Sequence, residues 1–444
     1  MASPTSWIRV AVLATWLGLV ACGKETGGGE ATDAPNVVLI VVDTLRADAL
    51  PAYGGARPVP GIDRLAAEGV TVDGLRSVTS WTVPSMATLF TGLPPREHRV
   101  MRMVGLGSNL TETQTLARRF RDAGYATGCV MSNFLLKGSK GFGEGYDLYD
   151  DALANRPDPH RGITSPQVTD RALAWLQEDR EKPWFLTLHY FDPHTSYEDH
   201  PEVDYLDPNY VGWVRGGLAD PDYKAFQESA SPADLAQLRA LYDEEVWAVG
   251  AAIDRLLVAL EERGELKNTI VIFTTDHGEE LAERGYIGHT RTLHFEQIDL
   301  PLIVRFPDGA AAGERREGPM AQEDLFATVL GLAGVPVPEG RGTSQAEWIR
   351  SGLSTMAEAV RYTYTEVDFE PVVADPKRRI LKRGVEKWDA SGKWLGKFVV
   401  DRKTGEEFLW TDPAERVNRI KSSAVAPLVA EMRAALESHP WYVP

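Results

Sequence analysis

Three continuous runs of apolar, mostly β-branched residues limit what this chain can fold into. Residues 37–42 read Val-Val-Leu-Ile-Val-Val, residues 184–188 read Trp-Phe-Leu-Thr-Leu, and residues 269–274 read Thr-Ile-Val-Ile-Phe-Thr. A strand that is apolar on both faces is typical of a parallel sheet covered by helices on both sides. Helical segments alternate with these runs, and the longest is expected over residues 233–263. We therefore predict an α/β fold.

The last part of the chain has a different pattern. From about residue 362 the segments are short and alternate apolar with polar residues, with turn dipeptides between them, which is typical of an antiparallel sheet. A closing helix carries apolar residues along one face, namely Leu428, Met432 and Leu436. We predict a large domain over residues 36–350 and a small C-terminal subdomain over residues 351–444.

Two of the apolar runs are followed by side chains that can bind a metal ion or take part in catalysis. Asp43 comes directly after the first run, and Asp276 and His277 come after the third. In open α/β sheets the ligand crevice lies beyond the carboxyl ends of the strands, so both strands would deliver these side chains to one edge of the sheet. Asp43 alone could equally be a helix cap.

The stretch from Ser80 to Gly92 places a hydroxyl residue shortly before a proline. Thr82 is followed by Pro84 and an apolar run, which predicts a helix that begins at about Val83 or Pro84 with Thr82 as its cap. The backbone N–H groups and the positive end of the helix dipole would hold a phosphate or sulfate group beside this hydroxyl. Taken alone, Thr82 is most simply a plain cap, so a catalytic role requires partners elsewhere.

Four side chains together could bind one divalent metal ion through two carboxylates, a hydroxyl and an imidazole. The four are Asp43, Thr82, Asp276 and His277. A metal here would polarise the Thr82 hydroxyl toward a nucleophile, and the reaction would pass through a covalent Thr82 adduct. His194 and His289 are candidates to bind the ester oxygens or to protonate the leaving group, although each alone could be an ordinary packing residue.

Several motifs resemble, in order and at similar spacing, the sulfatase family of the alkaline phosphatase superfamily. The main ones are Asn36–Asp48, Ser80–Ser85 with Thr91-Gly92, Asp192–Thr195 and Thr275–Glu280. Further matches continue to about Asn418. The resemblance implies a large mixed sheet between helices, a small C-terminal antiparallel-sheet domain, and an ester hydrolase that uses one divalent cation.

The same resemblance implies roles for individual residues. Metal-ligand positions match Asp43, Asp276 and His277, the nucleophile position matches Thr82, and positions that contact the anionic group of the substrate match His194 and His289. The implied reaction is hydrolysis of a small sulfate or phosphate ester by a metal-activated threonine. Two alternatives stay open, a catalytically silent lipoprotein that binds an anion or a partner, and a group transferase similar to phosphoethanolamine transferases.

Some positions depart from the family pattern. Sulfatases carry a Cys or Ser, converted to formylglycine, where this chain has Thr82, and an Arg where it has Met86. An unmodified Thr is similar to the nucleophile of nucleotide pyrophosphatase/phosphodiesterases and phosphoethanolamine transferases, which favours phosphate esters. Thr44 replaces a second metal-binding Asp, and His277 replaces Asn, a change that suits zinc or manganese better than calcium. Sulfatases with Asp-His at this place belong to the calcium users, so all three metals stay candidates.

The N-terminal residues are typical of a bacterial lipoprotein. Arg9 and an apolar run precede Leu-Val-Ala-Cys-Gly at residues 19–23, which resembles a lipobox. This predicts a signal peptide over residues 1–21, a lipid on Cys22, a flexible tether over residues 22–35, and export to the cell envelope with a lipid anchor in the membrane. An uncleaved membrane helix is the alternative, but the apolar run is shorter than the ~20 residues that span a bilayer.

The overall charge limits the class of partner. The formal net charge is −17, which argues against nucleic acid, whose phosphates are negative as well. The partners that the resemblance and the lipobox imply are a small sulfate or phosphate ester and, through the lipid, a membrane.

Overall fold

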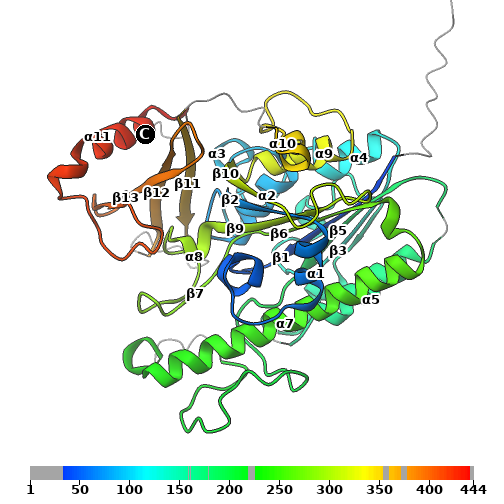
Figure 1. The fold of residues 1–444 in the computed structure, drawn as a ribbon, viewed down its shortest axis with the longest axis horizontal. Helices are drawn as coiled ribbons and strands as arrows, with labels where there is room; N and C mark the ends of the chain where they lie inside the picture. Colours follow the sequence, from blue (N-terminus) through cyan, green and yellow to red (C-terminus); the bar gives the residue numbers. More distant parts are fainter. Residues whose placement is uncertain are drawn as a thin grey trace, which may run out of the picture.

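A large sheet lies between two layers of helices, and a smaller sheet lies at one end of the molecule (Figure 1). The computed structural model describes residues 34–440, except 159, 161, 179, 219–225, 354–359 and 372–377. The predicted signal peptide, Cys22 and most of the predicted tether lie outside the described residues. Within the described ranges, no helix is both long and apolar enough to cross a membrane.

The large sheet has eight strands in the order β10-β2-β9-β6-β1-β5-β3-β4. They are β1 (Asn36–Val42), β2 (Val70–Arg76), β3 (Ala126–Met131), β4 (Leu148–Asp150), β5 (Trp184–Tyr190), β6 (Thr269–Thr275), β9 (Asp299–Arg305) and β10 (Arg315–Ala321). The three apolar runs are the adjacent strands β6, β1 and β5, which pair in parallel. Among these eight strands β9 alone runs in the opposite direction, so the sheet is mixed.

Strand β1 lies between two hydrophobic cores, which explains why each of its residues from 37 to 42 is apolar. Its odd-numbered residues from Val37 to Val41 face a core that includes residues of α2, α4 and α9. Its even-numbered residues from Val38 to Val42 face a core that includes residues of α1, α5 and α7. The bounds of these helices are α1 (Pro60–Glu68), α2 (Thr82–Thr91), α4 (Leu116–Asp122), α5 (Ser165–Leu176), α7 (Pro232–Glu262) and α9 (Asp324–Leu332).

The start of helix α2 differs from the sequence prediction by one residue. Trp81, in extended conformation, is the cap residue, and Thr82 is the first residue of the helix. The Thr82 hydroxyl lies beside Asp43 and His277 rather than serving as the cap. Thr82 nevertheless stands at the helix N-terminus, as predicted.

The C-terminal part forms a four-stranded antiparallel sheet, as predicted. Its strands are β11 (Arg361–Phe369), β12 (Ile380–Trp388), β13 (Trp394–Asp401) and β14 (Glu407–Trp410). Helix α11 (Ala426–Ser438) lies against this sheet through Val429, Met432 and Leu436 (Figure 1). The predicted fold class is confirmed, whereas the domain boundary at residue 350 stays a prediction.

The small sheet is joined to the large domain by buried polar contacts. Arg76 at the end of β2 contacts Glu386 of β12, with 2.9 Å between Nε and Oε2. Lys397 of β13 pairs with Glu415 and donates a hydrogen bond to the backbone oxygen of Leu293. Short elements near this joint and around the site complete the fold, namely α3 (Pro95–His98), β7 (Glu280–Leu281), β8 (Ile287–Gly288), α8 (Phe295–Ile298) and α10 (Ala346–Ser351).

Candidate active site at the carboxyl ends of β1 and β6

The register of two neighbouring strands brings the predicted metal ligands together. In the parallel pair β1 and β6, Val42 lies opposite Thr275, so Asp43 and Asp276 follow side by side. The N-terminus of α2 lies at the same edge. Thr82 Oγ1 is 3.5 Å from Asp43 Oδ1 and 3.2 Å from His277 Nε2. The structure thus places Asp43, Thr82, Asp276 and His277 in one cluster, as the sequence predicted.

The cluster places the carboxyl groups of Asp43 and Asp276 next to each other in the interior of the protein. Burial raises the pKa of Asp43 well above its usual value, and the nearby charge of Asp276 raises it further. Burial also raises the pKa of Asp276 to about 7. Asp43 receives a hydrogen bond of 2.6 Å from Asn133 Nδ2, but Asp276 Oδ2 has no hydrogen-bond partner among the described residues. Two buried carboxylates without a cationic partner fit the binding of a divalent cation.

The orientation of His277 supports the same conclusion. Its Nδ1 lies 2.9 Å from the backbone oxygen of Gly278, and because a carbonyl can only accept, Nδ1 carries the proton. The lone pair is then on Nε2, which faces Thr82 and lies 3.4 Å from Asp276 Oδ2. A backbone hydrogen bond that fixes the tautomer in this way is typical of metal-binding histidines.

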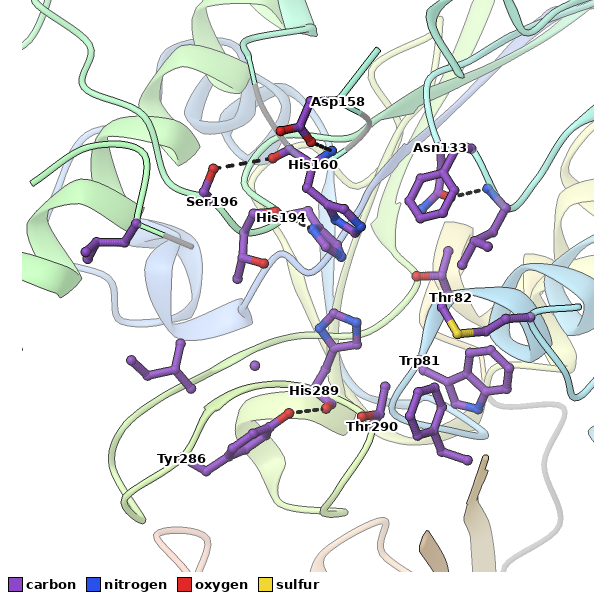
Figure 2. A pocket seen from close by; sticks show the side chains of 18 residues that line it. Trp81, Thr82, Asn133, Asp158, His160, His194, Ser196, Tyr286, His289 and Thr290 are labelled. Atoms are coloured by element: carbon purple, nitrogen blue, oxygen red, sulfur yellow. Dashed lines mark hydrogen bonds between the residues drawn. The ribbon is translucent and has the colours of Figure 1, made fainter. Parts of the chain in front are cut away.

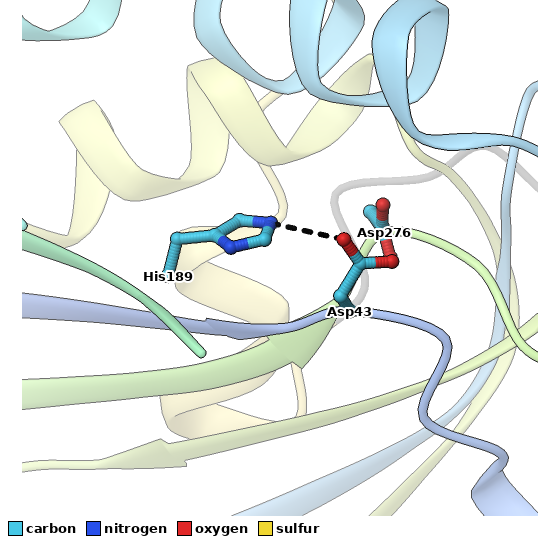
Figure 3. A group of neighbouring side chains, drawn as sticks. All are labelled: Asp43, His189 and Asp276. Carbon is cyan, nitrogen blue, oxygen red and sulfur yellow. Dashed lines mark ion pairs between the residues drawn. The ribbon is translucent and has the colours of Figure 1, made fainter. Parts of the chain in front are cut away.

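His189 is a member of this cluster that the sequence reasoning missed. It lies on β5 opposite Val41, is fully buried, and its Nε2 is 3.7 Å from Asp43 Oδ2. Within the described part of the chain neither ring nitrogen has a hydrogen-bond partner, and burial lowers its pKa to about 3. Figure 3 shows its ring turned toward Asp43 and Asp276, and the ligand atoms of the three lie within 4.8 Å of one another.

The sequence offered only a weak signal for His189, a polar residue near the carboxyl end of an apolar strand. The nearby Asp192 does not belong to the cluster. Its carboxylate accepts hydrogen bonds from the backbone and hydroxyl groups of Thr164 and Ser165. Asn133, which follows β3, was also missed, because nothing in its local sequence distinguishes it from a loop residue.

A cavity of about 530 Å³ opens in front of Thr82. His194 and His289 line it, with their ring centroids 5.1 Å apart, and the ring of His289 is 4.6 Å from that of His277. Figure 2 shows both rings on the side of the cavity that faces Thr82. The predicted contacts to an anionic group and the predicted nucleophile therefore share one cavity.

Hydrogen bonds fix the two cavity histidines. His194 Nδ1 lies 2.8 Å from the backbone oxygen of Thr195, and His289 Nδ1 lies 2.8 Å from Oε1 of Glu279. The proton is therefore on Nδ1 of His194, and Glu279 favours the same arrangement in His289. Burial lowers the pKa of His194, and so does the neighbouring His289.

The structure shows where two residues that depart from the family pattern, Met86 and Thr44, lie. Met86 is fully buried in the apolar core beneath α2, so it adds no charge to the site. Thr44 is also fully buried, and its backbone N–H donates a hydrogen bond of 3.2 Å to Asp276 Oδ1. The backbone at residue 44 thus orients one of the acids of the cluster.

A second group of possible ligands in the described residues is already neutralised. His294, Glu296 and Glu415 lie close enough to share a cation. However, Arg284 Nη1 is 2.6 Å from Glu296 Oε1, and Lys397 pairs with Glu415. We interpret this group as part of the joint between the two sheets.

Comparisons with known proteins show what this chain is similar to. The family model described as Sulfatase matches residues 35–335. An N-acetylglucosamine-6-O-sulfatase of Bacteroides thetaiotaomicron is 25% identical over 430 residues, covering 75% of each chain. The multifunctional alkaline phosphatase superfamily protein PehA of Trinickia caryophylli is 25% identical over 422 residues, covering 77% of this chain and 81% of its own.

The fold is likewise similar to solved structures. The phosphonate monoester hydrolase of Agrobacterium radiobacter superimposes with a TM-score of 0.71, at 21% sequence identity, over 91% of this chain and 95% of that one. At this level of identity the likeness concerns the fold.

Proposed function

The chain belongs to the sulfatase family, as a hydrolase acting on sulfuric or phosphoric ester bonds, and we propose that Thr82 is its nucleophile. The observation that carries the proposal is the position of the Thr82 hydroxyl, 3.2 Å from His277 Nε2 and 3.5 Å from Asp43 Oδ1 at a helix N-terminus. A threonine needs no conversion to formylglycine to attack a phosphorus or sulfur atom.

We further propose that one divalent cation, zinc, manganese or calcium, is held by the cluster. The ligands would be Asp43, Asp276 and His277, with Thr82 as the activated group and His189 close enough to complete the set. A bound cation would lower the pKa of the hydroxyl and draw charge from the ester. The unpartnered Asp276 oxygen and the unpartnered ring nitrogens of His189, counted over the described residues, support this assignment.

The reaction has two halves. As Thr82 Oγ1 forms a bond to the phosphorus or sulfur atom, its proton passes to Nε2 of His194 or His289, since both rings line the same cavity. The bond to the leaving oxygen breaks, and the imidazole gives that oxygen the proton. Water then gives a proton to the same imidazole and attacks the adduct, the bond to Thr82 Oγ1 breaks, sulfate or phosphate leaves, and the imidazole returns the proton to the Thr82 oxygen.

The alternatives make different predictions at this site. A silent binding protein would have no use for a hydroxyl held against a carboxylate and an imidazole, and the retention of all six predicted side chains counts against it. A transferase would differ only in using an alcohol in place of water. Measuring the release of free phosphate or sulfate distinguishes a hydrolase from a silent binding protein and from a transferase.

We also propose that the protein is exported and anchored to the bacterial cell envelope. The support is the lipobox-like sequence before Cys22, which lies outside the described residues. A lipid on Cys22 would place the hydrolase at a membrane surface, with the predicted tether between the lipid and β1.

The experiment is a parallel assay of an aryl sulfate, a phosphate monoester, a phosphate diester and a phosphonate monoester, each with added zinc, manganese or calcium. At least one ester should be hydrolysed, and Thr82→Ala should abolish that turnover while the fold and the bound metal remain. Thr79→Ala is the matched control, because its buried hydroxyl has no hydrogen-bond partner in the described residues. Undiminished turnover by Thr82→Ala would remove Thr82 from this role.

A further inference from the structure

The backbone oxygen of Asp276 connects the end of β6 to helix α2. Ser85 lies in the first turn of α2, three residues after Thr82, and its Oγ is 2.7 Å from this oxygen. Residues three apart lie on the same face of a helix, so the side chains of Thr82 and Ser85 both point toward the end of β6. The position of the nucleophile is therefore tied to that of a proposed metal ligand through Ser85.

Gln322 determines the direction of this hydrogen bond. It follows β10 and precedes α9, and its backbone N–H donates to the backbone oxygen of Arg76 at 3.0 Å. Its side-chain oxygen accepts from the backbone N–H of Val78, so its amide nitrogen faces Ser85 Oγ at 2.7 Å. Because an amide nitrogen can only donate, Ser85 accepts this hydrogen bond and gives its own proton to the oxygen of Asp276.

Ser85 makes the shortest of three side-chain contacts to the Asp276 oxygen. Gln322 Nε2 lies 3.3 Å from this oxygen. Ser77 Oγ lies 2.9 Å from it, but Ser77 Oγ is only 2.6 Å from the backbone oxygen of Thr79 and has one proton for the two. Ser85 and Gln322 are fully buried, and consecutive hydrogen bonds strengthen one another in such a low-dielectric interior.

We propose that Ser85 and Gln322 are positioning residues, which hold α2 against Asp276 so that the Thr82 hydroxyl stays directed at the metal-binding cluster. Neither side chain lines the cavity in front of Thr82, so both act through other residues. The proposal rests on the function given above. Without the link, α2 would keep its packing in the apolar core but would lose its fixed distance to the end of β6.

The kinetics of Ser85→Ala test the link. The full-length protein is assayed at saturating zinc or manganese with the ester that the wild type hydrolyses best, and circular dichroism checks the fold. The variant should lower kcat by about 10- to 100-fold, as removal of a group that orients a metal ligand does, and keep KM within about threefold of wild type. KM should stay because His194 and His289, which would bind the anionic group, lie on other elements.

Thr88→Val is the matched control. The Thr88 hydroxyl is buried in the same helix, and it lies 3.1 Å from His98 Nε2. Both variants lose one buried hydrogen bond of α2, so a general loosening of the helix would lower kcat in both. Thr88→Val should keep the wild-type kcat. An equal loss in the two variants, or a rise in KM alone in Ser85→Ala, would overturn the inference.

A second variant tests the part played by Gln322. Gln322→Met keeps the length of the side chain without its amide and should lower kcat to a similar extent. Because the two residues form one chain of hydrogen bonds, the double variant should lose no more than about threefold beyond the larger single loss. Losses that multiply would contradict the link. If Gln322→Met does not fold, the result with Ser85→Ala decides by itself.

Hydrogen exchange tests the link without metal or substrate. In EDTA the backbone amides of α2 should exchange about fivefold faster in Ser85→Ala than in wild type, the factor for one lost hydrogen bond, while those of α5 stay unchanged. Equal exchange of α2 in both proteins would overturn the inference. A wild type that hydrolyses no ester would refute the proposed function, whereas a normal kcat in both variants would refute only the positioning role.

Discussion

Replacing Asp276 with Asn should make the metal-free protein more stable at alkaline pH and at the same time remove its response to metal. In the structure Asp276 is fully buried beside Asp43, and one of its oxygens has no hydrogen-bond partner among the described residues. Asn keeps the oxygen that accepts from the backbone N–H groups of Thr44 and His277. It removes only the charge that the cation would neutralise.

The size of the effect follows from the pKa. Burial raises the pKa of Asp276 from its ordinary 3.8 to about 7. A raised pKa means that the folded state binds the proton more tightly than the unfolded chain does. The stabilisation of the folded state by this proton is therefore complete below about pH 4 and is lost as the pH rises through about 7. A rise of this size in the pKa corresponds to about 4 kcal/mol. Above pH 7 the metal-free wild type should therefore be less stable than Asp276→Asn by an energy of this order.

The assay is urea unfolding at pH 5 and pH 8, with EDTA or with added zinc or manganese. In metal at about 100 times its Kd the wild type should gain about 2.7 kcal/mol, and the variant should gain far less. The control is Asp170→Asn on the surface, whose pair with Arg255 is exposed and contributes under about 1 kcal/mol. A variant that is less stable than wild type at pH 8 in EDTA, or that gains as much from metal, would refute the reasoning.

Three further changes test other parts of the account. Lys397→Met removes the buried cation that pairs with Glu415, which keeps His294 and the backbone N–H of Phe295, and should cost about 3 kcal/mol in urea unfolding. A loss below about 1 kcal/mol would contradict the importance of this buried pair. Glu279→Gln removes the carboxylate that orients His289 and should lower kcat about tenfold with little change in KM, so a change in KM alone would argue against this role. Cys22→Ala should move the protein from the membrane to the soluble fraction, and continued sedimentation with membranes would contradict lipid anchoring.

The strands of the site could be predicted because their signal is local. An apolar run such as residues 37–42 identifies a strand buried on both faces, and the acid that follows it marks the carboxyl end. The reversed strand β9 could not be predicted in the same way, since its direction depends on its neighbours β2 and β6. The start of α2 was misplaced by one residue because Thr82 is turned toward Asp43 and His277.

His189 shows the limit of sequence reasoning at the site itself. It belongs to the cluster only because β5 pairs with β1 in a register that sets it opposite Val41. Asn133 reaches Asp43 across 90 positions of sequence for the same reason, through the order of β3, β5 and β1 in the sheet. Residues that reach the site only through the order of the strands have no neighbouring sequence pattern that marks them. Asp276 and His277 lie in a motif and could therefore be predicted.

The most direct test of the central claim is anomalous diffraction from crystals of the full-length protein grown with zinc or manganese. We expect one strong peak about 2 Å from the ligand atoms of Asp43, Asp276 and His277, with Thr82 Oγ1 facing the same ion. A protein that hydrolyses its ester with the ion bound elsewhere, or with Thr82 turned away from it, would contradict a metal-activated threonine.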